Sequence, residues 1–205
     1  GRKENFWEMA ETGPCGPCSE IHMDRGAEFC NRKNEPGHVC SVNGDCARFL
    51  EIWNLVFIQY NRVSETRFDP LPAKHVDTGM GLDRIVAILQ DVNSNYRTDL
   101  FSPMINKIRE LAGASETEMN ENFTPYRVIA DHTRAASFLI ADGVVPGNVG
   151  RNYVCRMIIR RAARFASKIG LNEPFMAKIA RVVIDEYGTA YPELLKNQKS
   201  ILDNL

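Results

Sequence analysis

The sequence predicts an α+β fold in which part of an antiparallel sheet is followed by an all-α domain. The first half alternates apolar with polar residues over short runs that are rich in aromatic and β-branched side chains. The second half spaces its apolar residues three and four apart, as amphipathic helices do. The pattern changes near residues 92–98, so we expect two domains, residues 1–95 and residues 96–205.

Strands are expected in three stretches of the first half. Ser19–Asp24 alternates polar and apolar residues, and Phe49–Asn61 is the strongest strand candidate. Lys74–Gln90 (KHVDTGMGLDRIVAILQ) predicts a short strand, a glycine turn and a helix. Residues 27–47 are rich in Gly, Pro, Asn and charge, so we expect an exposed insertion there.

Helices are expected throughout the second half, with glycine or proline at their ends. Their predicted bounds are Asp99–Leu111, Tyr126–Asp142, Asn152–Ile169, Pro174–Tyr187 and Pro192–Leu205. In the third of these helices, five apolar residues form a stripe that should pack inward: Val154, Ile158, Ala162, Phe165 and Ile169.

The composition limits the class of protein. The chain has 205 residues, is 44% hydrophobic and 25% charged, and has a formal net charge of -1, which is typical of a soluble globular protein. No apolar run approaches the roughly 20 residues of a membrane span, and no signal peptide opens the chain. Six cysteines are too few for a small secreted disulfide scaffold, so we expect the reducing cytoplasm. Because the chain begins with Gly1-Arg2-Lys3 rather than Met, we expect either an expression scar or an internal fragment.

The stretch VDTGMGLDR combines groups that suit a charged ligand. A strand delivers Asp77 to its end, where the carboxylate suits an ammonium group. Gly79 and Gly81 allow a ligand to approach the backbone, and Arg84 in the first turns of the helix could contact a phosphate. A structural strand–turn–helix with a surface arginine is the alternative that the residues alone leave open.

The expected strand Phe49–Asn61 places Asn54 and Val56 on one face and Glu51 on the other. A buried asparagine needs hydrogen-bond partners. Asn54 is therefore either a satisfied core amide or a polar anchor in a pocket.

The stretch 151–168 (RNYVCRMIIRRAARFASK) is basic and contains no acidic residue. Arg156, Arg160 and Arg164 recur every four residues, and Arg161 flanks them. Like charges at this spacing repel each other, so the helix gains no stability from them. A polyanion is the natural partner, and a solvated basic face is the alternative.

The cysteines raise the question of metal. Cys15 and Cys18 form a C-x-x-C pair inside ETGPCGPCSE, which zinc sites and redox sites share. The surrounding Gly–Pro repeat favours a rigid turn instead. The insertion holds four further metal-ligand types: Cys30, His38, Cys40 and Cys46. Their irregular spacing leaves zinc open but favours a thiol-bearing loop without metal.

Five motifs in order resemble the alanyl-tRNA synthetase family of class II synthetases over about residues 4–170. They are ENFWEMAETGPCGPCSEI, EIWNLVFIQYN, VDTGMGLDR, RVIADHTRA and GRNYVCRMIIRRA. The resemblance implies the C-terminal part of a class II catalytic domain, with motif 3 at residues 76–90. It implies that a helical domain recognising the tRNA acceptor stem follows.

The implied activity is ATP-dependent activation of L-alanine and its transfer to tRNA(Ala), with Mg2+ as cofactor. The resemblance assigns alanine binding to Trp7, Asn54, Val56, Asp77 and Gly79. It assigns ATP binding to Arg84, Gly81 and Glu51, although Glu51 would need a β-bulge to reach the site. It assigns tRNA binding to Asn148, Arg151, Arg156, Arg160, Arg161 and Arg164, with Asn148 contacting the G·U pair of the acceptor stem.

The sequence also departs from the family's pattern. No segment matches motif 1 or motif 2, and motif 2 supplies a further ATP-binding arginine in the family. We therefore expect the isolated chain to form no alanyl-adenylate. A non-catalytic RNA-binding module that has lost the ATP site is the alternative function, and the oligomeric state is left open.

Overall fold

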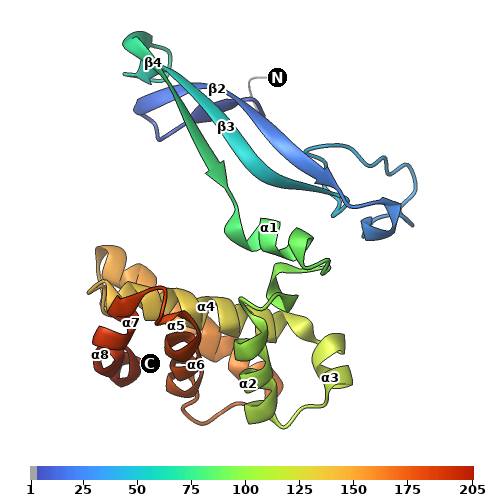
Figure 1. Ribbon diagram of the computed structural model, residues 1–205, viewed down its shortest axis with the longest axis vertical. Coiled ribbons are helices and arrows are strands. Elements are labelled where there is room, and N and C mark those ends of the chain that lie inside the picture. Colours follow the sequence, from blue (N-terminus) through green and yellow to red (C-terminus); the bar gives the residue numbers. More distant parts are fainter. Residues whose placement is uncertain (1–3) are drawn as a thin grey trace. The chain divides into compact units, whose positions relative to one another are not determined.

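The computed structural model describes residues 4–205, and the chain divides after Asn93 into two compact units. The residues on which the expectation of a fragment rested, 1–3, lie outside the described part. The first unit contains a four-stranded antiparallel sheet in the order β1-β2-β3-β4 (Figure 1). Its elements are β1 Phe6–Glu8, β2 Gly13–Asp24, β3 Phe49–Arg62, β4 Phe68–Met80 and the helix α1 Leu82–Leu89. The predicted α+β class and the strand Phe49–Asn61 are confirmed.

Strand β2 is longer than predicted, because the Gly–Pro stretch expected to be a turn is its first half. Its pairing with β3 is irregular between Cys15 and Cys18, and such bulges tolerate prolines that cannot donate to a regular ladder. Gly16 allows the close approach: a Cβ there would lie 1.9 Å from the carbonyl oxygen of Phe57. The turn prediction was wrong because a bulge reconciles proline with a strand.

Strand β4 also begins earlier than predicted, at Phe68 rather than near Lys74. It pairs only with β3 among the described strands, so Pro70 and Pro72 remove few ladder hydrogen bonds. The register passes from the Ile58–His75 pair to the Tyr60–Pro70 pair, leaving residues 71–74 as a bulge.

The second unit is helical, and none of the described helices is long and apolar enough to span a membrane. Its helices are α2 Ser102–Ala112, α3 Glu116–Glu121, α4 Phe123–Ala141, α5 Gly150–Ala166, α6 Met176–Tyr187, α7 Pro192–Lys196 and α8 Gln198–Asn204. The predicted helices that correspond to α2, α4, α5 and α6 are confirmed within a few residues at each end. Helix α4 packs against α2, α5 and α6 (Figure 1), and Ile108, Ile129 and Ile179 are fully buried in the core.

Two features of the helical unit were not predicted. Helix α3 begins at a capping box, in which Ser115 N–H donates to the carboxylate of Glu118 (2.8 Å) and Glu118 N–H donates to the Ser115 hydroxyl (3.3 Å). The predicted helix Pro192–Leu205 is two helices, broken at Asn197. The Asn197 amide donates to the carbonyl oxygen of Ala141 (3.0 Å), which ties the break to the end of α4.

The predicted stripe of α5 is confirmed for Ala162, which is fully buried, and for Phe165 and Ile169, which pack against the core. It is wrong for Val154, which is 48% exposed, and it omitted the fully buried Cys155 and Ala166. Helical spacing identifies an apolar face but cannot decide between two adjacent rows when both are apolar. Small residues on the buried row allow α5 to approach its neighbours closely.

The close approach at Gly16 generates a stability prediction. Gly16→Ala should destabilise the sheet by about 1–3 kcal/mol, because the added methyl group overlaps backbone that a side-chain rotation cannot move. The measurement is urea unfolding followed by tryptophan fluorescence. Gly79→Ala is the matched control, since a Cβ at Gly79 meets no atom within 4 Å. Equal stability of the two variants would contradict the prediction.

Candidate functional site

Four of the predicted alanine-binding residues form one patch on β3 and β4. Asn54 faces Gly79, and Val56 faces Asp77. Facing residues of antiparallel strands point to the same side, and residues two apart on a strand share a face. The structure therefore brings these four together. It does not do so for Trp7, which pairs with Gly16 on β2 and lies on a strand that β2 and β3 separate from β4.

The patch presents acceptor groups beside open space. The Asn54 side-chain oxygen is buried and has no hydrogen-bond partner among the described residues. Leaving such an atom unsatisfied costs about 1–3 kcal/mol, which favours the pocket anchor over the satisfied core amide for this oxygen. The Asp77 carboxylate is exposed, and the space that a side chain at Gly79 would fill is open. Two acceptor side chains beside an unfilled space suit a ligand that donates hydrogen bonds.

Arg84 and Glu51, both predicted at the ATP site, are in contact. Arg84 Nη1 donates to the Glu51 carbonyl oxygen (2.7 Å) and lies 3.2 Å from Glu51 Oε2. The β2–β3 register shifts between the Ile21–Trp53 pair and the His22–Glu51 pair, so Ile52 is the extra residue of a bulge. The bulge that Glu51 required is therefore present next to it.

The turn before α1 holds Arg84 close to the sheet. Gly81 N–H donates to the Ile52 carbonyl oxygen (3.1 Å). A Cβ at Gly81 would lie 3.3 Å from Arg84 Cδ, so glycine leaves room for the arginine stem. The Arg84 side chain remains 43% exposed and can contact a ligand while one nitrogen stays on Glu51.

The insertion reaches the same row of the sheet through Asn43. Glu20 on β2 faces Asn54 on β3, and Asn43 Nδ2 donates to Glu20 Oε2 (2.9 Å). His22 Nε2 lies 3.0 Å from the same oxygen. These hydrogen bonds, that with His22 first, lower the pKa of Glu20.

The four metal-ligand types of the insertion converge, contrary to the preference drawn from their spacing. The ligand atoms of Cys30, His38, Cys40 and Cys46 all lie within 4.8 Å of one another. The Arg48 backbone N–H lowers the pKa of the Cys46 thiol, whereas a hydrogen bond with Cys30 raises the pKa of Cys40. The chain turns of the insertion, which have no sequence period, bring these residues together.

Cys15 and Cys18 have structural surroundings. Both are buried, and their sulfur atoms lie 3.7 Å from the Tyr60 carbonyl oxygen and 3.9 Å from the Glu4 carbonyl oxygen. Burial raises the pKa of the Cys18 thiol, which opposes thiolate formation. Neither joins a group of three metal ligands within residues 4–205.

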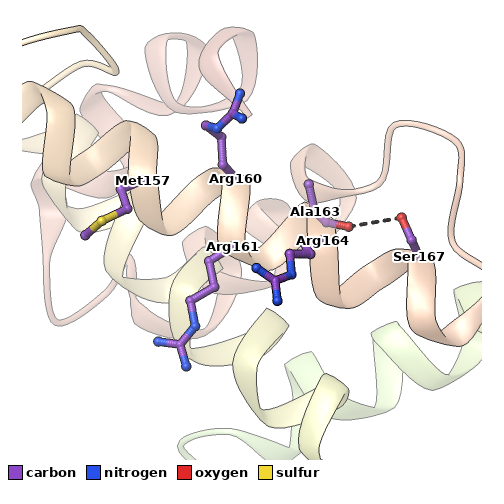
Figure 2. A pocket seen from close by; sticks show the side chains of 6 residues that line it. All are labelled: Met157, Arg160, Arg161, Ala163, Arg164 and Ser167. Atoms are coloured by element: carbon purple, nitrogen blue, oxygen red, sulfur yellow. Dashed lines mark hydrogen bonds between the residues drawn. The ribbon is translucent and has the colours of Figure 1, made fainter.

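The basic face of α5 lines a groove of about 630 Å³ (Figure 2). Arg160, Arg161 and Arg164 line it together with Met157, Ala163 and Ser167. In Figure 2 the guanidinium groups of Arg161 and Arg164 extend in one direction and that of Arg160 points away from them. None of the three forms an ion pair with a described residue, so all three charges are available to a ligand.

Asn148 and Arg156 extend this basic face. Asn148 Oδ1 accepts a hydrogen bond from Arg156 Nη1, and both residues are exposed. Arg156 and Arg160 line a second hollow of about 360 Å³ with Tyr153 and Met157. Arg151 is exposed in the first turn of α5.

Sequence reasoning missed Asn152 as the residue that positions the turn carrying Asn148. Its amide donates to the Val145 carbonyl oxygen (2.8 Å), and its own carbonyl oxygen accepts from Gly147 N–H (3.0 Å). The signal was an asparagine in the first turn of a helix that follows a Pro–Gly turn.

The base of the insertion is closed by an ion pair. Both Asp24 carboxylate oxygens accept from Arg48 at 2.7 Å, and Arg25 N–H donates to the Arg48 carbonyl oxygen (3.0 Å). The Arg48 guanidinium lowers the pKa of Asp24 to about 2. The ends of β2 and β3 are thereby held together.

Comparisons with known proteins agree on one family. The family model of class II (A) tRNA synthetases matches residues 1–205. The chain is similar to the alanine–tRNA ligase of Oleidesulfovibrio alaskensis, with 52% identity over 200 residues that cover 97% of this chain and 22% of the relative. It is 48% identical to that of Desulfosudis oleivorans over 206 residues, covering 100% of this chain and 23% of the relative. For Legionella pneumophila the identity is 49% over 201 residues, 98% of this chain and 22% of the relative. The chain thus spans less than a quarter of the length of these relatives.

The Asp24–Arg48 pair should make stability depend on pH. Because the pKa of Asp24 is lower in the folded state than in the unfolded chain, the pair stabilises the fold above about pH 4–5. That contribution is lost as the pH falls toward about 2. The urea midpoint of Asp24→Asn should therefore be lower than that of the unaltered chain near neutral pH, and the two midpoints should converge in acid. Arg48→Gln should behave alike, since it removes the same pair; parallel profiles down to low pH would refute the assignment.

Proposed function

The chain belongs to the class II (A) tRNA synthetase family, and from this premise we propose that it serves an alanine–tRNA ligase by binding alanine, ATP and the acceptor stem of tRNA(Ala). The single observation that carries the proposal is the patch of Asn54, Val56, Asp77 and Gly79, with the unpartnered Asn54 oxygen inside it. The names of its relatives, at about 50% identity, point to the same activity.

The patch suits two groups on the Cα of alanine, the ammonium group and the methyl group. Asp77 would accept from the α-ammonium group, and the Asn54 oxygen supplies a second acceptor. Val56, which is 7% exposed, offers an apolar surface to the methyl group, and Gly79 leaves space beside it. Trp7 is proposed as a further wall of this pocket. A pocket of this kind rejects large side chains but discriminates weakly against glycine and serine.

Arg84 would contact the phosphates of ATP. It lies in the first turn of α1, where Gly81 allows close approach to the backbone. Glu51 holds the guanidinium and offers a carboxylate to Mg2+, which prefers oxygen ligands. Mg2+ would supply neutralisation of phosphate charge.

The reaction needs positioning more than acid–base chemistry. The alanine carboxylate would attack the α-phosphorus of ATP, giving alanyl-adenylate and pyrophosphate. A hydroxyl at the 3′ end of the tRNA would then attack the alanyl carbonyl carbon, and AMP would leave. The patch and Arg84 would hold the reacting groups and offset their charge. We still predict that the chain alone forms no alanyl-adenylate, because no segment of it matches motif 1 or motif 2. The proposed location is the cytoplasm.

The α5 face would hold the acceptor stem. Arg151, Arg156, Arg160, Arg161 and Arg164 are exposed on a helix with no acidic residue and suit phosphate groups. Phosphate contacts position a protein on RNA, whereas base contacts specify. Asn148, placed beside Arg156 by the turn that Asn152 holds, is the proposed base contact.

Asp77 gives the test of alanine binding. In an alanine–tRNA ligase that carries this segment, Asp77→Asn should lower kcat/KM for alanine about 10- to 100-fold in pyrophosphate exchange, because it removes a charge-assisted hydrogen bond. Asp69→Asn is the matched control on the same strand, since Asp69 pairs with Arg67 outside the patch. An unchanged kcat/KM in Asp77→Asn would reject the patch as the alanine site. Absence of exchange in the parent ligase, with stem binding retained, would favour the RNA-binding module.

Arg160 gives the test of RNA binding. Arg160→Glu should weaken binding of an acceptor-stem RNA hairpin about 10-fold or more and reduce the slope of log K against log salt by about 1. Lys199→Glu makes a comparable charge reversal on an exposed residue of α8 and should have little effect. Fluorescence anisotropy at several salt concentrations measures both. An equal loss in the two variants would show that net charge, not the α5 face, governs binding.

A further inference from the structure

We propose that Cys30, His38, Cys40 and Cys46 bind one Zn2+ ion, which holds the insertion folded against the sheet. This site is separate from the patch and from Arg84, and it needs neither to be correct.

The geometry fits a tetrahedral ion. His38 Nε2 lies 3.6 Å from Cys40 Sγ, and two such ligands on one tetrahedral Zn2+ lie about 3.6 Å apart. Sulfur ligands of the same ion lie about 3.8 Å apart, so the observed limit of 4.8 Å requires a contraction of about 1 Å at most. Three thiols and an imidazole favour Zn2+ over Mg2+ or Ca2+, and four protein ligands make a closed structural site.

The insertion has no hydrophobic core that could bring these groups together. Cys30 is the one buried residue in the range 27–47, at 4% exposure. Val39 and Val42, the aliphatic residues near the cluster, are 79% and 53% exposed. The His38 side chain, by contrast, is only 8% exposed. Small segments that lack a core are commonly held by a metal or a disulfide, and here the most buried side chains include two of the ligands, Cys30 and His38.

A carboxylate stands behind the histidine, as it does in many zinc sites. Asp45 Oδ1 lies 3.9 Å from His38 Nδ1, while Nε2 faces the sulfur atoms. Arg32 forms ion pairs with Asp45 and with Glu35. A small shift that brings Asp45 within hydrogen-bond distance of Nδ1 would fix the ring's orientation and make Nε2 a better ligand.

The loop between two of the ligands reaches the sheet. Cys40 and Cys46 bracket Asn43, whose φ of 56° places it in the left-handed region. The Asn43 amide donates to Glu20, which faces Asn54 across β2 and β3. A metal ion bound to Cys40 and Cys46 would therefore keep Asn43 hydrogen-bonded to Glu20, and loss of the ion would release this hydrogen bond.

Metal analysis tests the proposal directly. The chain, purified with reductant and without a histidine tag, should contain about one Zn2+ per molecule when measured by inductively coupled plasma mass spectrometry. Replacement by Co2+ should give the intense visible absorption of a tetrahedral ion and a thiolate-to-cobalt charge-transfer band in the near ultraviolet. Metal-free chain that gives neither band on adding Co2+ would overturn the proposal, as would a disulfide between two of the three cysteines in the protein isolated under reducing conditions.

Variants separate the cluster from the other cysteines. Cys46→Ser and His38→Gln should lose the metal, whereas Cys18→Ser and Cys155→Ala should keep it. Loss in Cys18→Ser equal to that in Cys46→Ser, with both proteins folded by circular dichroism, would assign the ion to the C-x-x-C pair instead. In the unaltered chain, chelation should increase hydrogen exchange in residues 40–48, whereas the helical unit should not change. Unchanged exchange in residues 40–48 after metal removal would show that no ion holds the insertion.

Discussion

The first unit depends on the register of β3, which pairs with β2 on one side and β4 on the other. Along this strand, alternate residues belong to opposite faces, so a slip by one residue would exchange Asn54 and Val56 for their neighbours. The register also sets which residues of β2 and β4 stand opposite them, namely Glu20, Gly79 and Asp77. The bulge at Ile52 then lets Glu51 reach Arg84 without disturbing the pairs further along. β3 thus aligns groups from β2, from β4 and from the helix α1 that follows β4.

In the helical unit, α5 combines a closely packed side with a highly charged side. The fully buried residues of α5 are small, namely Cys155, Ala162 and Ala166, and Ile159 and Phe165 pack beside them against the core. The long side chains of Arg160, Arg161 and Arg164 lie on the exposed side of the helix. No acidic side chain of α5 offsets them, so the positive potential is directed outward.

Sequence patterns identified the elements whose signals are local and periodic. β3 and the helices α2, α4, α5 and α6 follow from spacing, and the strand–turn–helix around Gly79 and Gly81 follows from glycines between two periodic segments. The pairing of Asn54 with Gly79 needed only strand parity and an antiparallel neighbour. Patterns failed where a rare local geometry decided the outcome, as at Gly16, where an irregular stretch between Cys15 and Cys18 accommodates Pro17 within β2. For the insertion the sequence supplied the four candidate ligands but not their convergence, because irregular turns bring these residues together and leave no period to detect.

The unpaired edge of β4 bears both on ligand binding and on aggregation of the protein. Within the described residues this strand has a neighbour on one side, so the backbone N–H and C=O groups of the other side are a template for an added strand. Pro70, Pro72 and Lys74 obstruct such addition over the first half of the strand, whereas Val76, which is 67% exposed, begins a half without proline or lysine. That second half is also the one that carries Asp77 and Gly79. The open edge that leaves these residues accessible is thus the same edge at which copies of the chain would assemble into intermolecular sheets, and whatever covers it protects the protein from aggregation.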